Sequence, residues 1–306
     1  MRVAAVDIGT NSVLLLIAER DARGELVALA ERATITRLGA GVDRARRLAP
    51  EAIERTLSCL VDYAEEIRRL GVERLDVVGT SAMRDSASGD ELVLKATEIL
   101  GIAPRVISGE EEARLTFEGA LGGLGLSGAV TVFDVGGGST ELVRGRSDGL
   151  GVAIAEARSF QIGSVRLLER FVHHDPPSSE ELTKVRSLVR DELSSFAPPS
   201  RTEALVGIAG TVTTLAAVAR GVEPYDANRV HGMRLPADEV QRVAQKLWSL
   251  PLAERRALPG LEPRRADVIV TGAAIVAEVL AWSSADELIV SDRGVRWGLV
   301  EALAPL

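Results

Sequence analysis

Three glycines followed by two hydroxyl residues, at positions 136–140, form the segment of this sequence with the strongest chemical signature. Glycine lets the backbone approach an anion closely, and successive backbone N–H groups can form a concave nest around phosphate oxygens. The alternative is a tight hairpin turn, which needs only one or two glycines. Asp134 and Glu141 flank the run. We therefore predict phosphate binding by Gly136, Gly137, Gly138 and Ser139.

The same pattern occurs near the start of the chain. Residues 3–16 (VAAVDIGTNSVLLL) align with residues 130–143 (VTVFDVGGGSTELV), so that Asp7 corresponds to Asp134 and Ser12 to Ser139. One Asp-x-Gly turn between two strands is common, but two at equivalent places favour an internal duplication. We expect an α/β protein with two similar lobes and a shared cleft between them. In the first lobe, the predicted phosphate-binding residues are Thr10, Asn11 and Ser12.

Two aspartates, Asp7 and Asp134, each follow an apolar strand and precede a turn. Carboxylates in such places can hold a hard cation, commonly Mg²⁺, which in turn binds phosphate oxygens. The alternative for each residue alone is an Asx-turn, in which the side chain bonds its own backbone. For the pair facing one cleft, we favour a metal site.

A run of acidic residues at 110–112 follows Ser108-Gly109 and begins an expected helix. Ser108 and Glu111 have the spacing of a capping box, and Glu110 suits the positive end of the helix. Glu112 lies beyond these positions and is a candidate general base that deprotonates an attacking water. A solvated glutamate is an equally good interpretation of the residues alone.

Two further segments place hydroxyls or an arginine after a buried strand. In TSAMRD (80–85), Arg84 can clamp phosphate with its guanidinium, and a helix cap with a surface arginine is the alternative. In GIAGTVT (207–213), Gly210 and Thr211 can form another wall of the cleft, and a helix entry packed on a strand is the alternative.

Composition limits the class of protein. The chain has 306 residues, of which 46% are apolar and only 3% aromatic, as suits helices packed on largely parallel strands. Its net charge of −8 disfavours nucleic acid as a partner. The single cysteine, Cys59, excludes an internal disulfide and is expected to be a buried thiol. Without a signal sequence or long apolar run, we expect a cytoplasmic protein that does not bind membranes.

Hydrophobic periodicity predicts the elements that position these residues. Strands are expected at 2–8, 13–18, 74–79, 104–107, 130–135, 204–208 and 287–291. Helices are expected at 51–70, near 90–100, from 109, near 163–171, at 179–195, from 210, near 237–248 and 264–281, and from about 294. Pro50 suits the first position of the helix expected at 51–70, and Gly71 suits its C-terminal end. The three histidines have no ligand-like spacing and are expected in loops.

Taken together, these segments resemble the exopolyphosphatase and guanosine pentaphosphate phosphatase (Ppx/GppA) family. The resemblance is carried by DIGTNS (7–12), TSAMRD (80–85), ISGEEEARLTFEGA (107–120), DVGGGSTE (134–141), GTVTTLAA (210–217), ADVIVTGAAI (266–275) and VSDRGVRWG (290–298), in the family's order along nearly the whole chain. Actin-like kinases share the two-turn pattern but not ISGEEEAR together with GGGSTE.

The resemblance implies a duplicated actin-like (ribonuclease-H-like, ASKHA) fold with an interdomain cleft, formed by residues 1–125 plus about 295–306 and by residues 126–294. It implies hydrolysis of a terminal phosphoanhydride, in polyphosphate or guanosine pentaphosphate, by a homodimer with Mg²⁺ (or Mn²⁺). Glu112 matches the family's catalytic base and Glu141 a second carboxylate that positions the water or metal. Asp7 and Asp134 match metal-associated aspartates, and Arg84 matches a substrate-contacting arginine.

Two departures from the family pattern bear on affinity. Leu14 stands where the family usually has an arginine, and Trp297 stands where an acidic residue is common. These departures motivate one alternative function, a non-catalytic sensor of polyphosphate or a guanosine alarmone. Another alternative is an actin-like ATPase or sugar kinase. Retention of four carboxylates, Asp7, Glu112, Asp134 and Glu141, argues against the sensor.

Overall fold

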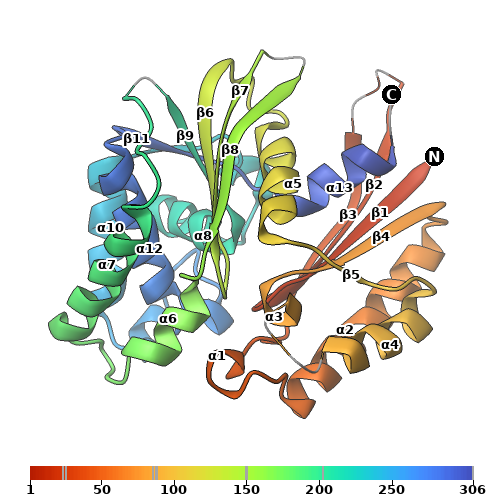
Figure 1. Cartoon of the computed structure of the whole chain (residues 1–306), viewed down its shortest axis with the longest axis horizontal. Helices are drawn as coiled ribbons and strands as arrows, with labels where there is room; N and C mark the ends of the chain where they lie inside the picture. Colours follow the sequence, from red (N-terminus) through yellow and green to blue (C-terminus); the bar gives the residue numbers. More distant parts are fainter. Residues whose placement is uncertain are drawn as a thin grey trace. The chain divides into compact units, whose positions relative to one another are not determined.

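The computed structural model describes residues 1–22, 24, 26–84, 86, 89–148, 151–201 and 203–304, with only the backbone at Asp43 and Arg44. Asp85, the last residue of the TSAMRD segment, lies outside these residues. The chain forms two compact units: unit 1 comprises Met1–Gly119 and Val295–Leu306, and unit 2 comprises Ala120–Gly294. The domain limits expected from the sequence were 125/126 and 294/295. Figure 1 shows the order of the elements along the chain.

Unit 1 is built on a five-stranded sheet with the order β3-β2-β1-β4-β5. Strands β1 (Arg2–Ile8), β2 (Ser12–Arg20) and β3 (Leu26–Ile35) form an antiparallel meander, and β4 (Arg74–Gly79) and β5 (Arg105–Val106) continue the sheet in parallel with β1. The apolar β1 and β2 lie inside the sheet because both of their faces are covered.

Alternate residues of β1 face two different layers of helices. Ala4, Val6 and Ile8 pack on the side of α2 (Pro50–Arg69) and α4 (Gly89–Leu100). Val3 and Ala5 pack on the side of α5 (Gly109–Leu121) and α13 (Val295–Leu303). Because side chains alternate along a strand, Asp7 belongs to the second face. Two short helices, α1 (Val42–Ala45) and α3 (Ser81–Arg84), complete unit 1.

Helix α2 confirms its sequence signals. Pro50 occupies its first turn, and Gly71 follows its end with a φ of 64° in the left-handed region that glycine adopts easily. Cys59 is buried on its apolar face, and burial raises the pKa of its thiol, as expected of an unreactive cysteine.

Unit 2 is built on a six-stranded sheet with the order β10-β11-β9-β6-β7-β8. Strands β6 (Gly128–Val135), β7 (Thr140–Ser147) and β8 (Val152–Phe160) form a second antiparallel meander, and β9 (Ala204–Ile208) and β11 (Glu287–Val290) extend it in parallel with β6. The short β10 (Arg234–Pro236) pairs antiparallel with β11 at the edge.

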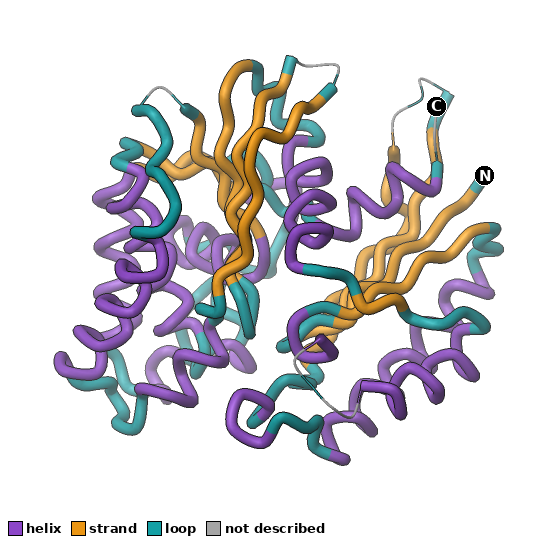
Figure 2. Tube along the Cα trace, viewed as in Figure 1, coloured by secondary structure: helices purple, strands orange, loops and turns teal. Residues whose placement is uncertain are grey.

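The larger helical layer of unit 2 covers one face of this sheet. It contains α6 (Ser164–Phe171), α7 (Ser179–Leu193), α8 (Ala209–Arg220), α10 (Ala237–Ser249) and α12 (Ile269–Ser283), with the short α9 (Ala227–Val230), α11 (Leu252–Arg255) and the 3₁₀ turn Pro263–Arg265. Phe133, Val135 and Leu142 point into this layer. Helices α7, α10 and α12 lie together beside the strands, and Figure 2 shows them in purple against the orange sheet.

The two sheets confirm the internal duplication. Counted along the chain, the strands of each sheet lie in the order third, second, first, fourth. The first three strands are antiparallel to their neighbours, and the fourth is parallel to the first. The sequence did not predict β3 and β8, the third strand of each sheet. It also began the helix expected at 264–281 too early, because residues 263–265 form a separate 3₁₀ turn. Among the described residues, no helix has the length and hydropathy needed to cross a membrane.

The start of α7 is fixed by a buried carboxylate. Ser178 and Glu181 form a reciprocal capping box, and Glu181 also accepts hydrogen bonds from the backbone of His173 (2.7 Å) and from Nδ1 of His174 (2.8 Å). Burial alone would raise the pKa of Glu181. The hydrogen bonds from Ser178, His174 and His173 outweigh it and lower this pKa to about 2.

We predict that Glu181→Gln lowers the free energy of unfolding at pH 7 by about 1–2 kcal/mol, because it removes a charged cap. The folded-state pKa lies below the unfolded one, so the charge stabilises the fold above about pH 4.5 and ceases to do so as the pH falls toward 2. Urea unfolding of the wild type and the variant at pH 7 and pH 3 measures this, with Glu180→Gln as the exposed neighbouring control. An equal difference at both pH values would contradict it.

Candidate phosphate-binding and catalytic site

One hydrogen bond closes the predicted phosphate-binding turn in both units. The backbone N–H of Gly9 donates to the carbonyl of Ser12 at 3.0 Å, and that of Gly136 donates to the carbonyl of Ser139, also at 3.0 Å. A Cβ atom on Gly9 would lie 2.9 Å from the Ser12 carbonyl oxygen. The equivalent glycine and serine of the two copies therefore make the same turn, as the alignment predicted.

In unit 2, three successive carbonyls of the turn point toward α6. The Gly136 oxygen accepts from Ser164 N (2.9 Å), and the Gly137 oxygen accepts from the N–H groups of Val165 (2.9 Å) and Arg166 (3.1 Å). The Gly138 oxygen accepts from Nε of Arg166 at 2.7 Å. In a planar trans peptide the C=O and the following N–H point in opposite directions.

The N–H groups that follow these carbonyls therefore point away from α6. They belong to Gly137, Gly138 and Ser139, three consecutive residues. Consecutive backbone donors on one side of a turn are the arrangement that binds anions. Helix α6 approaches this turn closely, since a Cβ atom on Gly163 would lie 2.4 Å from the Gly137 oxygen.

In unit 1, the turn is held from behind by the segment that follows β3. The Thr10 carbonyl accepts from Gly39 N at 2.8 Å, and the Asn11 carbonyl accepts from the N–H groups of Thr36 (3.1 Å) and Arg37 (2.9 Å). By the same argument, the N–H groups of Asn11 and Ser12 point away from residues 36–39. In each unit, the carbonyls of the turn are thus held on one side and the N–H groups that follow them point to the other. The segments that hold the carbonyls are unrelated.

The strand register places the carboxylates relative to these turns. Asp7 lies opposite Leu14 on β2, and Asp134 lies opposite Glu141 on β7. Directly opposed residues share a face of the sheet, so Asp134 and Glu141 are neighbours on the face of sheet 2 away from its larger helical layer. Glu141 is 1% exposed, and its Oε1 accepts from the Ser159 hydroxyl at 2.7 Å.

Glu112 and Arg84 are brought together within unit 1. Nη1 of Arg84 donates to Oε2 of Glu112 at 3.1 Å and to the carbonyl of Ile107 at 3.0 Å. Glu112 is 7% exposed, so it is not the solvated surface glutamate that the sequence left as an alternative. In the described part of the chain, Nη2 of Arg84 is buried and has no hydrogen-bond partner, so it remains a donor for an anion.

The capping box expected at 108–111 is half present. The Ser108 hydroxyl accepts from Glu111 N at 3.1 Å, which confirms Ser108 as the cap of α5. The Glu111 carboxylate accepts instead from Nη1 of Arg105 at 2.8 Å. An arginine within reach thus takes the carboxylate that the sequence assigned to the cap.

Gly210 and Thr211 begin α8 after the end of β9. The Thr211 hydroxyl donates to the Val135 carbonyl at 3.2 Å, which ties α8 to the strand that leads into the glycine turn. The guanidinium of Arg265 lies over Gly210, where a Cβ atom would meet it. Phosphate binding by Gly210 and Thr211 stays a prediction.

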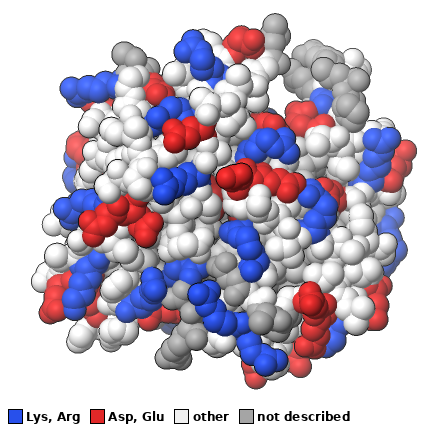
Figure 3. Space-filling view, viewed as in Figure 1, with Lys and Arg blue, Asp and Glu red and all other residues white. Residues whose placement is uncertain are grey.

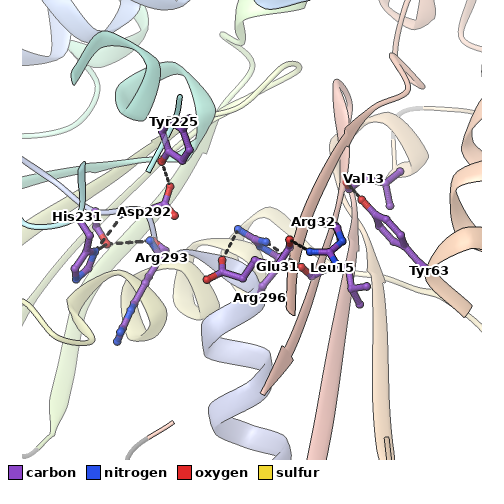
Figure 4. Close-up of polar contacts among 11 residues, drawn as sticks. Val13, Leu15, Glu31, Arg32, Tyr63, Tyr225, His231, Asp292, Arg293 and Arg296 are labelled. Carbon is purple, nitrogen blue, oxygen red and sulfur yellow. Dashed lines mark hydrogen bonds and ion pairs between the residues drawn. The ribbon is translucent and has the colours of Figure 1, made fainter. Parts of the chain in front are cut away.

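Both sequence departures lie in unit 1. Trp297 is buried in the apolar cluster that contains Val3 and Leu16. The position where an acidic residue is common is therefore part of the hydrophobic core in this chain. Leu14 is partly exposed, on the strand just after the turn. In Figure 4, Tyr63 donates to the Val13 carbonyl and Arg296 donates to the Leu15 carbonyl, one residue on each side of Leu14.

The histidines lie in connections, as expected. His173 and His174 follow α6, and His231 follows α9. Nδ1 of His231 accepts from the backbone N–H of Asp292 at 3.3 Å, and Tyr225 donates to the Asp292 carboxylate, as Figure 4 shows. Burial, together with the charge of Arg293, lowers the pKa of His231, so this ring serves as a neutral acceptor.

The expected Mg²⁺ would need side-chain oxygen ligands close to the turns. No group of three or more His, Cys, Asp or Glu side chains suited to a metal ion occurs among the described residues. Mg²⁺ needs only one or two carboxylates when water and phosphate supply its other ligands. Asp7, 8% exposed, ends the strand before the first turn, and Oδ1 of Asn11 is buried with no hydrogen-bond partner in the part of the chain described. These oxygens fit such an ion.

On the face shown in Figure 3, acidic and basic side chains are interspersed. Anion recognition at this site therefore depends on local donors, namely backbone N–H groups and individual arginines.

Comparison with known proteins settles the family. The sequence profile of the Ppx/GppA phosphatase family matches residues 16–305. The chain belongs to this family. It is 42% identical to exopolyphosphatase 2 of Mycobacterium tuberculosis over 322 aligned residues, which cover 99% of this chain and 98% of the relative.

Solved structures of the Ppx/GppA family support the same assignment. The family member from Aquifex aeolicus is 37% identical, with a TM-score of 0.84 over 99% of this chain and 97% of that one. An exopolyphosphatase from Cytophaga hutchinsonii is 25% identical, with a TM-score of 0.89 over 99% of this chain and 98% of that one. The two units accordingly have the duplicated actin-like fold that the sequence predicted.

Two residues that hold the glycine turn and Glu141 in place were not predicted from the sequence. Arg166 binds the glycine turn from α6, and Ser159 binds Glu141 from β8. An arginine in a short amphipathic helix has no sequence signal that distinguishes it from a surface arginine, and β8 itself was not predicted. The glycine before α6, Gly163, also lies close to the turn, because a Cβ atom there would lie 2.4 Å from the Gly137 oxygen.

We predict that Gly163→Ala weakens binding of inorganic tripolyphosphate by about 10-fold or more, because the turn must shift to admit the methyl group. Titration calorimetry on the wild type and the variant measures this. Gly151→Ala is the matched control in the same unit, since a Cβ atom there meets only the Asp148 side chain at 3.9 Å. Unchanged affinity in the Gly163 variant would show that the turn does not bind the anion.

Proposed function

We propose that this protein is an exopolyphosphatase that releases terminal orthophosphate from inorganic polyphosphate by attack of water. The observation that carries the proposal is the row of three N–H groups, at residues 137–139, directed away from α6. The Mycobacterium tuberculosis relative named exopolyphosphatase 2 supports polyphosphate as the substrate. Phosphoryl transfer depends mainly on positioning and charge neutralisation, which backbone donors and arginine provide.

In the proposed reaction, Glu112 is the general base. Its carboxylate accepts a proton from water while the water oxygen forms a bond to the terminal phosphorus. The bond from phosphorus to the bridging oxygen breaks, and its electron pair stays on the shortened polyphosphate. Arg84 orients Glu112 through Oε2 and directs its remaining donor at a phosphate oxygen.

The remaining residues bind and orient the substrate. The N–H groups of residues 137–139 bind the oxygens of one phosphate in unit 2, and those of Asn11 and Ser12 are phosphate donors in unit 1. Glu141, held by Ser159, positions the water or the ion. Mg²⁺ or Mn²⁺, held by Asp7 and Asp134, would neutralise phosphate charge when bound.

Guanosine pentaphosphate is a second proposed substrate because it ends in the same phosphoanhydride as polyphosphate. A cytoplasmic location, expected from the sequence, and a homodimer, implied by the family resemblance, also stay predictions. The two other functions are outcomes of the assay below: phosphate transfer from ATP to an acceptor would indicate a kinase, and tight binding without phosphate release would indicate a sensor.

We predict that Glu112→Gln lowers kcat for phosphate release by about 10²–10⁴-fold, because the amide cannot accept the proton. KM is expected to change little, since the binding donors remain. Phosphate release from polyphosphates of several lengths and from guanosine pentaphosphate, with Mg²⁺, provides both constants.

Glu111→Gln is the matched control, because Glu111 is the adjacent carboxylate and pairs with Arg105. It should keep nearly the full kcat. Equal turnover in the wild type and Glu112→Gln would remove Glu112 from the mechanism.

A further inference from the structure

We propose that Arg166 is a positioning residue, whose guanidinium holds the glycine turn of unit 2 in the orientation that binds phosphate. The inference rests on the proposed function. Arg166 lies on α6 and is 8% exposed, and its side chain donates from Nε to the Gly138 carbonyl (2.7 Å) and from Nη2 to Oε1 of Gln161 (3.0 Å). A buried arginine is costly to desolvate and calls for a specific use.

The backbone of α6 cannot supply the donor that Gly138 needs. The first three N–H groups of a helix have no partner within it. Here Ser164 N is used by Gly136, and the N–H groups of Val165 and Arg166 are used by Gly137. The next N–H, on Leu167, donates within the helix to the Gly163 carbonyl at 2.9 Å. The third carbonyl of the turn is therefore satisfied by a side chain.

The guanidinium of Arg166 fixes the orientation of the peptide group between Gly138 and Ser139. With the Gly138 carbonyl turned toward the guanidinium, the N–H of Ser139 faces the opposite side. Rotation of that peptide would remove one donor from the anion side and present a carbonyl oxygen to a phosphate, which repels it. Glycine resists such rotation least of all residues, so a turn of three glycines depends most on an external restraint.

Unit 1 restrains its turn differently. There the carbonyls of Thr10 and Asn11 are held by backbone N–H groups of residues 36, 37 and 39. Thr10 also carries a Cβ, which limits its freedom. Within the described part of the chain, no side chain is seen to hold a carbonyl of the first turn as Arg166 holds that of Gly138.

The test compares Arg166→Met and Arg166→Lys with Arg170→Met, an exposed arginine on the same helix. For Arg166→Met we expect KM for polyphosphate to rise by about 10- to 100-fold, the loss expected for a charge-assisted hydrogen bond, with kcat changed much less. Lysine can make one of the two hydrogen bonds, so Arg166→Lys should recover part of the affinity. Arg170→Met should match the wild type.

Gln161→Met provides a second variant in case Arg166→Met does not fold. Gln161 is exposed, and its loss frees one end of the guanidinium, so KM should rise in the same direction by a smaller factor. A merely structural role predicts lower kcat in proportion to misfolded protein, unchanged KM and no rescue by lysine. Either that pattern or wild-type kinetics in both variants would overturn the inference.

Calorimetry with inorganic tripolyphosphate separates this inference from the proposed function. If the wild type binds tripolyphosphate but releases no phosphate, the proposed function fails, and weaker binding by Arg166→Met would still support the positioning role. If the wild type is active and Arg166→Met binds tripolyphosphate equally well, the positioning role alone fails.

Discussion

The site depends on one constraint: the carbonyls of two equivalent turns are held from behind, so that their N–H groups point the other way. A hydrogen bond from Gly9 to Ser12 in unit 1, and from Gly136 to Ser139 in unit 2, closes each turn. Because each peptide is planar, fixing a carbonyl fixes the next donor. A protein with a net charge of −8 can in this way offer local positive potential to a polyanion.

The duplicated units have kept the same sheet and turn but have diverged in what surrounds them. In unit 2, Asp134 lies opposite a buried glutamate, Glu141, whereas in unit 1 Asp7 lies opposite Leu14. Unit 1 instead contributes Glu112 with its Arg84 partner, from α5 and α3. The duplicated strand-turn-strand unit thus carries a buried glutamate on its own second strand in one copy, whereas in the other copy the proposed base comes from a separate helix.

Much of this arrangement was predictable because it is local in sequence. The paired turns, the strands around them and α2 each have a clear signature of apolar runs, glycines and caps. Strands β3 and β8 each begin with a short apolar run (26–30 and 152–155) that charged residues interrupt. They were missed because most of their side chains are exposed or half-exposed, so the pattern of a half-buried strand is weak. Contacts between segments far apart in the chain, such as Arg166 with Gly138 and Arg84 with Glu112, have no such signature.

The central claim is tested most directly by a crystal structure of the Glu112→Gln variant with inorganic tripolyphosphate and Mg²⁺. The account predicts phosphate oxygens within about 2.7–3.2 Å of the backbone nitrogens of Gly137, Gly138 and Ser139, on the side away from α6. The N–H groups of Asn11 and Ser12 should likewise contact phosphate oxygens. A tripolyphosphate bound elsewhere, with both turns free of phosphate, would contradict the account.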